Sequence, residues 1–203
     1  MDCLLIKKST LIGIVDALRS SPGYMKTYTV KDMMEDIGPA IVSNRHILRQ
    51  LLEGNFDSSF ILPENITSIR ESAFYGCTSL ALTSLPEGLV SIEDHVFDGC
   101  ANITLTSLPK NLVSIGESAF DLCSSLALTS LPESLVSIGE KAFYRCTGLK
   151  SITFKGTPEA IAVNAFGNCS SLVTINVPWS EGEVANAPWG AINATINYNY
   201  TGE

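Results

Sequence analysis

Apolar residues recur along most of this chain with a period of 23 residues, which is neither the period of a helix nor that of a strand. Residues 62–84 read LPENITSIRESAFYGCTSLALTS, and segments 85–107, 108–130 and 131–153 copy this unit, followed by a looser copy to about residue 176. Four rows keep the spacing without insertion: Phe74, Phe97, Phe120, Phe143 and Phe166; Cys77, Cys100, Cys123, Cys146 and Cys169; Ile69, Ile92, Ile115, Ile138 and Ile161; and Leu80, Ile103, Leu126, Leu149 and Leu172. One unit cannot bury its own apolar residues, whereas stacked units share a core, so each row predicts a column of side chains along a solenoid.

The pattern thus predicts a β-rich solenoid of five 23-residue coils over residues 51–177. Neighbouring coils joined by strand pairing lie about 4.8 Å apart, so five coils make a slab only about 24 Å long. Both of its open ends are expected to be capped.

In the first three coils the sequence does not decide whether one leucine of the unit faces the core or the surface. Each places a leucine directly before a threonine, where the fourth coil instead has Ile152 at the threonine position. The leucines are Leu82, Leu105 and Leu128, and the threonines are Thr83, Thr106 and Thr129. Since a one-residue slip moves every side chain to the other face, either a bulge turns the leucines inward or they form an apolar row on the surface.

Residues 1–50 do not repeat and are predicted to form a small helical segment. Residues 9–20 and 29–43 carry apolar side chains at helical spacing, and Ser9 or Thr10 suits the N-cap of the first helix. The apolar positions of the two helices include Leu11, Ile14, Leu18, Met33, Met34 and Ile37. Two short helices cannot bury a core alone, so we expect them to pack on each other, on the first coil or on another chain. This makes residues 1–50 a candidate anchoring and assembly segment.

Residues 178–203 are predicted to be a C-terminal cap, because Pro178 breaks the repeat. A loop rich in Pro and Gly, with Trp179 and Trp189, leads into a tail at 192–200 in which apolar and polar residues alternate. This alternation predicts a strand that pairs with, or covers, the edge of the last coil.

Charge narrows the range of partners. The net charge is −8, but residues 1–50 hold seven basic and five acidic side chains, and the remaining residues hold six and sixteen. An acidic body repels phosphate backbones, so we expect no nucleic-acid partner. No apolar stretch approaches the roughly 18 residues of a membrane-spanning helix. No signal peptide is visible either, so membrane insertion and secretion by that route are not expected.

The cysteine row offers little chemistry. It contains no C-x-x-C pair and no nearby histidine that would favour zinc. Coils about 4.8 Å apart are further apart than the Cβ separation of about 3.8 Å that disulfides prefer. We therefore interpret these cysteines as small buried hydrophobic residues. His95 stands at a variable position and is expected to be solvated, and no catalytic or phosphate-binding motif is present. The sequence predicts no enzyme, no metal site and no cofactor.

Recognition through a surface remains, because solenoids bind through the extended face of their successive strands. The candidate binding residues are Thr83, Thr106, Thr129, Lys150, Tyr75, Tyr144 and Arg145. The threonines are also explained if they only suit a strand. Near-identical coils fit a repetitive target, such as a polysaccharide, or no target at all.

The unit LPxxLxSIgexAFxxCxxLxxxx resembles the BspA-like (Treponema-type) leucine-rich repeats. Their SI-x-x-x-A-F-x-x-C core stands intact at 114–123 and 137–146, and the resemblance covers residues 62 to about 177. It implies the solenoid fold. Proteins with such repeats include bacterial surface adhesins, parasite surface proteins and many phage virion proteins.

The N-terminal segment is similar to the start of many phage structural proteins from low-GC Gram-positive hosts, whose pattern is roughly L-x-x-I-A-D-A-I-R-x-K-x-G … D-M-x-x-x-I. The matching residues are Leu11, Ile14, Asp16, Ala17, Leu18, Arg19, Gly23, Asp32, Met33 and Ile37. Val15 and Ser21 depart from the pattern. The stretch VPWSEGEVANAPWGA at 177–191 is also similar to the end of repeat-bearing phage proteins.

Together the resemblances imply a non-enzymatic phage virion protein, a head or tail appendage made in the host cytoplasm. It would attach to other virion proteins through residues 1–50, as a homo-oligomer such as a trimer, and display the repeats to a host-surface protein or polysaccharide. Two alternatives stay open. One is a bacterial BspA-like surface adhesin, which would need a signal peptide and an anchor. The other is a cytoplasmic protein-interaction scaffold.

Overall fold

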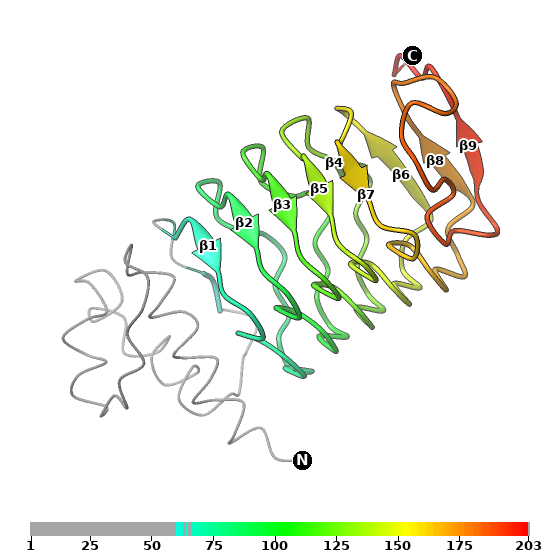
Figure 1. Cartoon of the computed structure of the whole chain (residues 1–203). Coiled ribbons are helices and arrows are strands. Elements are labelled where there is room, and N and C mark those ends of the chain that lie inside the picture. The colour runs from blue at the N-terminus through cyan, green and yellow to red at the C-terminus, as the bar shows by residue number, and fades with distance from the viewer. Residues whose placement is uncertain (1–59, 63, 65, 203) are drawn as a thin grey trace, which may run out of the picture.

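The computed structural model describes residues 60–62, 64 and 66–202, and they form a solenoid of stacked coils (Figure 1). Short strands from successive coils pair in parallel to build two sheets along its length. The first sheet consists of β1 (Ser68–Ile69), β2 (Ser91–Ile92), β3 (Ser114–Ile115), β5 (Ser137–Ile138) and β7 (Ala160–Ile161). The second consists of β4 (Ser130–Leu131), β6 (Ser151–Phe154), β8 (Thr174–Asn176) and β9 (Thr195–Asn197). The predicted fold class is thereby confirmed for this part of the chain.

The first sheet stacks equivalent residues of successive coils on one another. Ser68 pairs with Ser91 and Ile69 with Ile92, and the same register continues to β7. The isoleucine of each strand is buried, whereas the preceding residue faces outward. β-Branched isoleucine suits such a half-buried pleated position. The 23-residue spacing therefore becomes, in space, one residue directly above another.

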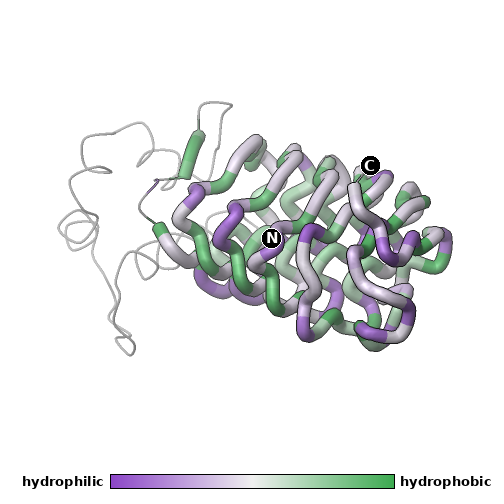
Figure 2. Tube along the Cα trace, turned by 90° about the horizontal axis from the view of Figure 1, so that it is seen from above, coloured by the Kyte–Doolittle hydropathy of each residue, from purple (hydrophilic) through white to green (hydrophobic). Residues whose placement is uncertain are grey.

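The core runs through the inside of the stacked coils, and the phenylalanine row belongs to it. Neighbouring rings from Phe74 to Phe166 stack with centroids 5.2–5.5 Å apart and interplanar angles of 3–21°. Hydrophobic residues recur at matching places in successive coils (Figure 2). Full burial of one such side chain contributes roughly 1.5–3 kcal/mol, so the shared core holds coils that could not fold singly.

The orientation left open in the first three coils is settled by burial. Leu82, Leu105 and Leu128 are buried, and each is followed by two residues of which the first, the threonine, is exposed. Two outward residues in succession, the threonine and the serine, follow each leucine, so the leucine faces inward out of the alternation of a regular strand. The expectation that these threonines lie in a strand is wrong: Thr83, Thr106 and Thr129 lie in no strand, and Thr129 directly precedes β4. Two outward residues in succession interrupt the alternation that a strand needs.

The C-terminal segment continues the solenoid as an altered sixth coil. β9 pairs in parallel with β8, which confirms the predicted capping strand. The partners Asn176 and Asn197 are 21 residues apart, so this coil is shorter than the repeat. Trp189 stands one period after Phe166, is fully buried, and its carbonyl accepts the N–H of Phe166 at 2.9 Å. A tryptophan thus ends the phenylalanine row.

Only part of the tail follows its predicted alternation. Ala194, Ile196 and Tyr198 pack against the core, whereas Ile192 precedes β9 and is 84% exposed. The predicted N-terminal helices and their apolar residues lie outside the described part of the chain. Among the described residues, none belongs to a helix with the length and apolar character needed to cross a bilayer.

Candidate binding surfaces

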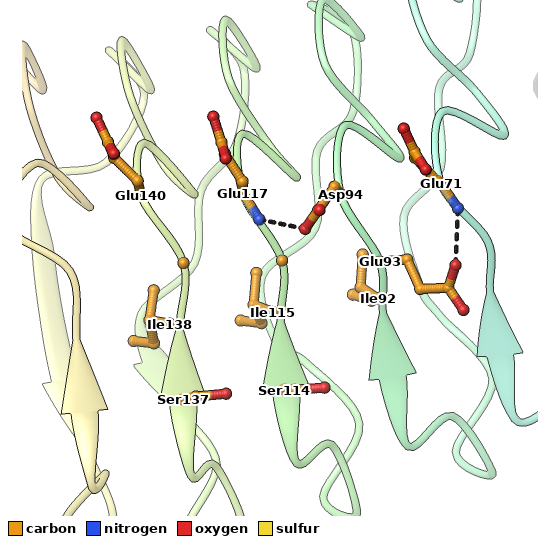
Figure 3. A pocket seen from close by; sticks show the side chains of 12 residues that line it. Glu71, Ile92, Glu93, Asp94, Ser114, Ile115, Glu117, Ser137, Ile138 and Glu140 are labelled. Atoms are coloured by element: carbon orange, nitrogen blue, oxygen red, sulfur yellow. Dashed lines mark hydrogen bonds between the residues drawn. The ribbon is translucent and has the colours of Figure 1, made fainter.

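An open groove of about 580 Å³ lies on the first sheet, where β2, β3 and β5 end (Figure 3). Backbone and side-chain atoms of the Ser-Ile strand pairs and of two glycines line its middle. Carboxylates line one side, at one position in each of four successive coils. These are Glu71, Asp94, Glu117 and Glu140, and Glu93 adds a fifth. The repeat thus turns one acidic position of the unit into a row of negative charge.

Two of the carboxylates bind the coils together. Glu93 Oε2 accepts the backbone N–H of Glu71 at 3.0 Å, and Asp94 Oδ1 accepts that of Glu117 at 2.7 Å. Glu71 and Glu117 use only their backbone in these bonds, and their side chains are exposed. Glu140 is also exposed and lies 3.8 Å from the ammonium of Lys141. Three side chains of the row can therefore meet a partner.

Glycine is required in the groove because successive coils approach closely there. A Cβ on Gly116 would lie 2.4 Å from Asp94 Oδ1 and 2.6 Å from the carbonyl carbon of Glu93. A Cβ on Gly139 would lie 2.6 Å from the backbone nitrogen of Glu117. All three separations are far below van der Waals contact, so the sequence Ile-Gly-Glu in the third and fourth coils reflects packing between coils.

The seven binding residues predicted from the sequence fall into two parts of the coil. Thr83, Thr106, Thr129 and Lys150 are exposed, and they lie on the side of the coil that leads into the second sheet. Tyr75, Tyr144 and Arg145 lie on the turns after the phenylalanine row. None of them lines the groove of the first sheet. Their role in binding stays a prediction.

The turn residues differ in how much side chain they leave to a partner. Tyr144 Oη accepts a hydrogen bond from Asn168 Nδ2 at 2.6 Å, and the Arg145 guanidinium lies 5.1 Å from the Tyr144 ring centroid. Tyr75 is 48% exposed and meets the ring of His95 edge-on at 6.4 Å. Tyr144 and Arg145 are thus engaged within the chain, and Tyr75 is the more available.

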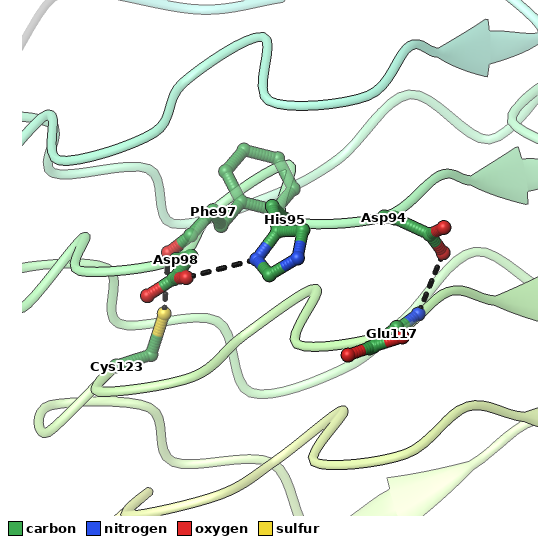
Figure 4. A network of polar contacts seen from close by, with 6 residues as sticks. All are labelled: Asp94, His95, Phe97, Asp98, Glu117 and Cys123. Atoms are coloured by element: carbon green, nitrogen blue, oxygen red, sulfur yellow. Dashed lines mark hydrogen bonds and ion pairs between the residues drawn. The ribbon is translucent and has the colours of Figure 1, made fainter.

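The carboxylates of Asp94, Asp98 and Glu117 and the imidazole of His95 lie on the neighbouring turns (Figure 4). His95, expected to be solvated, is 36% exposed, and its Nδ1 lies 3.0 Å from Asp98 Oδ2. Burial raises the pKa of the Asp121 carboxyl, and the nearby charge of Asp98 raises it further. The Oδ1 atom of Asp121 is buried and has no hydrogen-bond partner in the described part of the chain.

Cys123 lies near this network, but its thiol is unsuited to act as a nucleophile. The Sγ atom donates to the carbonyl of Phe97 at 3.1 Å, and burial raises the pKa of the thiol well above its usual range. Nucleophilic attack needs the thiolate, which a lowered pKa would favour. Cys123 therefore does not supply a nucleophile that the His95–Asp98 pair could activate.

The other cysteines of the row behave alike. Cys100, Cys146 and Cys169 donate to the carbonyls of Phe74, Phe120 and Phe143 at 2.9–3.0 Å. Burial raises the pKa of each thiol, that of Cys169 to about 12. The described cysteines are free and buried, which confirms their interpretation as core residues. The sequence did not reveal that these thiols also satisfy carbonyls of the preceding coil.

No group of three or more His, Cys, Asp or Glu side chains within the described ranges is placed to hold a metal ion. The groove carboxylates lie in a row and two of them hold backbone N–H groups. The chemistry that this surface offers is therefore electrostatic attraction along a line of charge.

Stacked coils with short parallel strands, aligned interior rows and open strand faces define the leucine-rich-repeat class of solenoid. The chain belongs to the BspA type leucine-rich repeat family: the model of the BspA type Leucine rich repeat region matches six copies across residues 53–173. The match begins before residue 62, where the first repeat was placed from the sequence. Repeats of this class typically serve as non-catalytic binding modules.

Three solved structures are similar. The leucine rich repeat protein TpLRR of T. pallidum is 29% identical over 72% of this chain and 67% of its own, with a TM-score of 0.55. A leucine-rich repeat protein of Bacteroides ovatus is 28% identical over 57% of this chain and 30% of its own, with a TM-score of 0.48. A leucine rich cell surface protein of Faecalibacterium prausnitzii is 26% identical over 59% and 40%, with a TM-score of 0.43. A comparison with curated proteins finds no match.

Proposed function

We propose that this protein is a non-enzymatic, adhesin-like binding protein that recognises its partner through the groove of the first sheet. The groove carries this proposal, since it presents a carboxylate in each of four successive coils beside a ladder of parallel strands. Membership of a repeat family whose solenoids act as binding modules supports it.

The charge row indicates the chemistry of the partner. Its carboxylates follow one another at the separation of paired strands, about 4.8 Å, and Glu71, Glu117 and Glu140 are exposed. A partner that lies along the groove with positive groups at short intervals would meet several of them together. Such binding would weaken with salt, because ions screen exposed charges beyond roughly 8 Å at physiological ionic strength.

A matched pair of triple variants tests the groove. One carries Glu71→Gln, Glu117→Gln and Glu140→Gln. The other removes the same three charges from exposed positions outside the groove, Glu64→Gln, Glu87→Gln and Glu133→Gln. Fluorescence anisotropy with a labelled oligolysine, and with oligoglutamate as the opposite charge, measures affinity for each. We expect oligolysine affinity to fall about tenfold, or about 1.4 kcal/mol, in the groove variant only. Equal losses in both variants would show that oligolysine is attracted by the net charge of the protein and not by a site in the groove.

For the biological setting we propose a phage head or tail appendage that is anchored through residues 1–50. The similarity of residues 10–37 to phage structural proteins supports this. Mass spectrometry of purified particles should find the protein, and light scattering should show a closed oligomer, such as a trimer, that becomes monomeric without residues 1–50. Presence in a bacterial surface fraction instead would favour the adhesin alternative. One stoichiometric cytoplasmic protein in a pull-down would favour the scaffold.

A further inference from the structure

A second pocket, of about 640 Å³, lies on the other side of the solenoid at its C-terminal end. It forms where the end of β6 meets the segment that follows β9, near the end marked C in Figure 1. Its lining residues are Thr153, Phe154, Lys155, Pro178, Asn199, Tyr200, Thr201 and Gly202. The pocket is open to solvent, and its lining combines apolar surface with a few polar groups, as the linings of small-ligand sites do.

Hydrogen bonds fix the walls of this pocket. The N–H of Lys155 donates to the carbonyl of Leu131 at 3.1 Å, which holds the end of β6 against the preceding coil. On the other wall, the N–H groups of Asn199 and Tyr200 donate to the carbonyls of Trp179 and Val177 at 3.0 and 2.9 Å. These bonds join Asn199 and Tyr200 to the segment that follows β8, so both walls are tied to the solenoid by its own backbone.

The pocket differs in charge from the groove. Among its lining residues Lys155 alone carries a formal charge, and no carboxylate is present. No ion pair involves the Lys155 ammonium among the described residues. In a chain of net charge −8, this ammonium forms a local positive site.

The uncharged lining suits a ligand rich in hydroxyl groups. Thr153 Oγ1 accepts a hydrogen bond from Asn176 Nδ2 at 3.1 Å, so its own O–H can be donated elsewhere. Thr201 and the Asn199 amide add further donors and acceptors. The Tyr200 ring and Pro178 offer apolar surface of the kind that packs against the C–H face of a sugar ring.

We propose that this pocket binds a sugar ring that carries one negatively charged group, a carboxylate or a phosphate, with the charge at the Lys155 ammonium. The inference shares with the proposed function only the premise that the protein is a binder. Its site is separate from the groove, since the two have no lining residue in common.

Titrating the isotope-labelled full chain with glucuronate, glucose 6-phosphate and glucose, followed by ¹H–¹⁵N spectra, tests the site. We expect shifts confined to residues 153–155 and 199–202, with at least one acidic sugar binding about tenfold more tightly than glucose. The two acidic probes distinguish a uronate from a sugar phosphate as the source of the charge. Shifts elsewhere, no shifts, or equal affinity for glucose would overturn the proposal.

Two lysine variants separate a specific contact from a change in net charge. Lys155→Met should reduce the affinity for the preferred acidic sugar to that for glucose. Lys110→Met, at an exposed lysine of the third coil and outside the pocket, should leave it unchanged. Both positions are exposed, so folding is not at stake. Equal effects of the two variants would contradict the assignment.

The groove variant keeps the two proposals distinguishable. Glu71→Gln, Glu117→Gln and Glu140→Gln together should leave the sugar titration unchanged. Loss of sugar binding in that variant would contradict a separate site. If the protein binds the sugar but not oligolysine, the groove proposal is rejected and the pocket proposal stands.

Discussion

The two sheets of the solenoid are built from the same coils but differ in regularity. In the first sheet, β1, β2, β3 and β5 all have the sequence Ser-Ile, and the groove beside them is acidic in successive coils. The second sheet begins only at β4, and its paired positions change from Ser130 to Thr153 to Asn176. Repetition thus produces a uniform surface on one side, and its loss produces an individual pocket on the other.

The spacing of inward residues differs between the first coils and β6. In the first coil the buried Leu82 and Leu85 are separated by two outward residues. In β6 the buried Ile152 and Phe154 are separated by a single residue, which is the alternation of a regular strand. The third coil keeps the early pattern at Leu128, and only the residues that follow it, Ser130 and Leu131, pair with β6 as β4. The difference teaches that a regular strand forms where inward and outward residues alternate.

Both sheets depend on the phenylalanine row, so its removal should have the largest effect. Phe120 stacks between Phe97 at 5.2 Å and Phe143 at 5.4 Å and is fully buried. Phe120→Ala should lower the free energy of unfolding by about 3–5 kcal/mol, because it leaves a cavity in the shared core. Urea denaturation measures this. Tyr75→Ala, at an exposed aromatic position, should change it by no more than about 0.5 kcal/mol, and similar losses in both would contradict the core assignment.

A substitution beside the first sheet should have an intermediate effect. Gly116→Ala places a Cβ against Asp94 and the Glu93 backbone, so it should destabilise the chain by about 1–3 kcal/mol. Gly88→Ala is the control, because its nearest contacts are 3.5 Å away. Thermal unfolding of both variants measures the difference. If Gly116→Ala were neutral, the close approach of the coils in the groove would be wrong.

The smallest effect is expected in the second sheet, which has an amide row. Asn176 Nδ2 donates to Thr153 Oγ1 at 3.1 Å, and its Oδ1 accepts from Asn197 Nδ2 at 2.8 Å. Asn176→Ala removes both bonds from a buried side chain and should cost about 0.5–1.5 kcal/mol. Asn102→Ala, where an exposed amide donates to Thr78 O, should cost less. Chemical denaturation that ranks Asn102→Ala above Asn176→Ala would show that the amide row does not stabilise the sheet.

Sequence spacing predicted the buried rows because equal spacing in a solenoid means stacking in space. Trp189 also follows Phe166 by one period, so the same spacing could have placed it in the core. It was missed because the residues around it no longer match the repeat unit. The acidic groove was less predictable. Glu117 and Glu140 recur whenever the unit recurs, so their repetition gave no separate signal of a surface.

By itself the sequence determined the coil length, the interior rows and the capping strand, since burial of apolar residues at a fixed period admits one stacked arrangement. Only the tertiary structure decided that Leu82, Leu105 and Leu128 turn inward, because two registers one residue apart satisfy the same pattern. It also decided which side chains meet around the two pockets. The C-terminal pocket joins Thr153 to Tyr200 across more than one coil, and such proximity depends on how the last, irregular turn folds back on the stack.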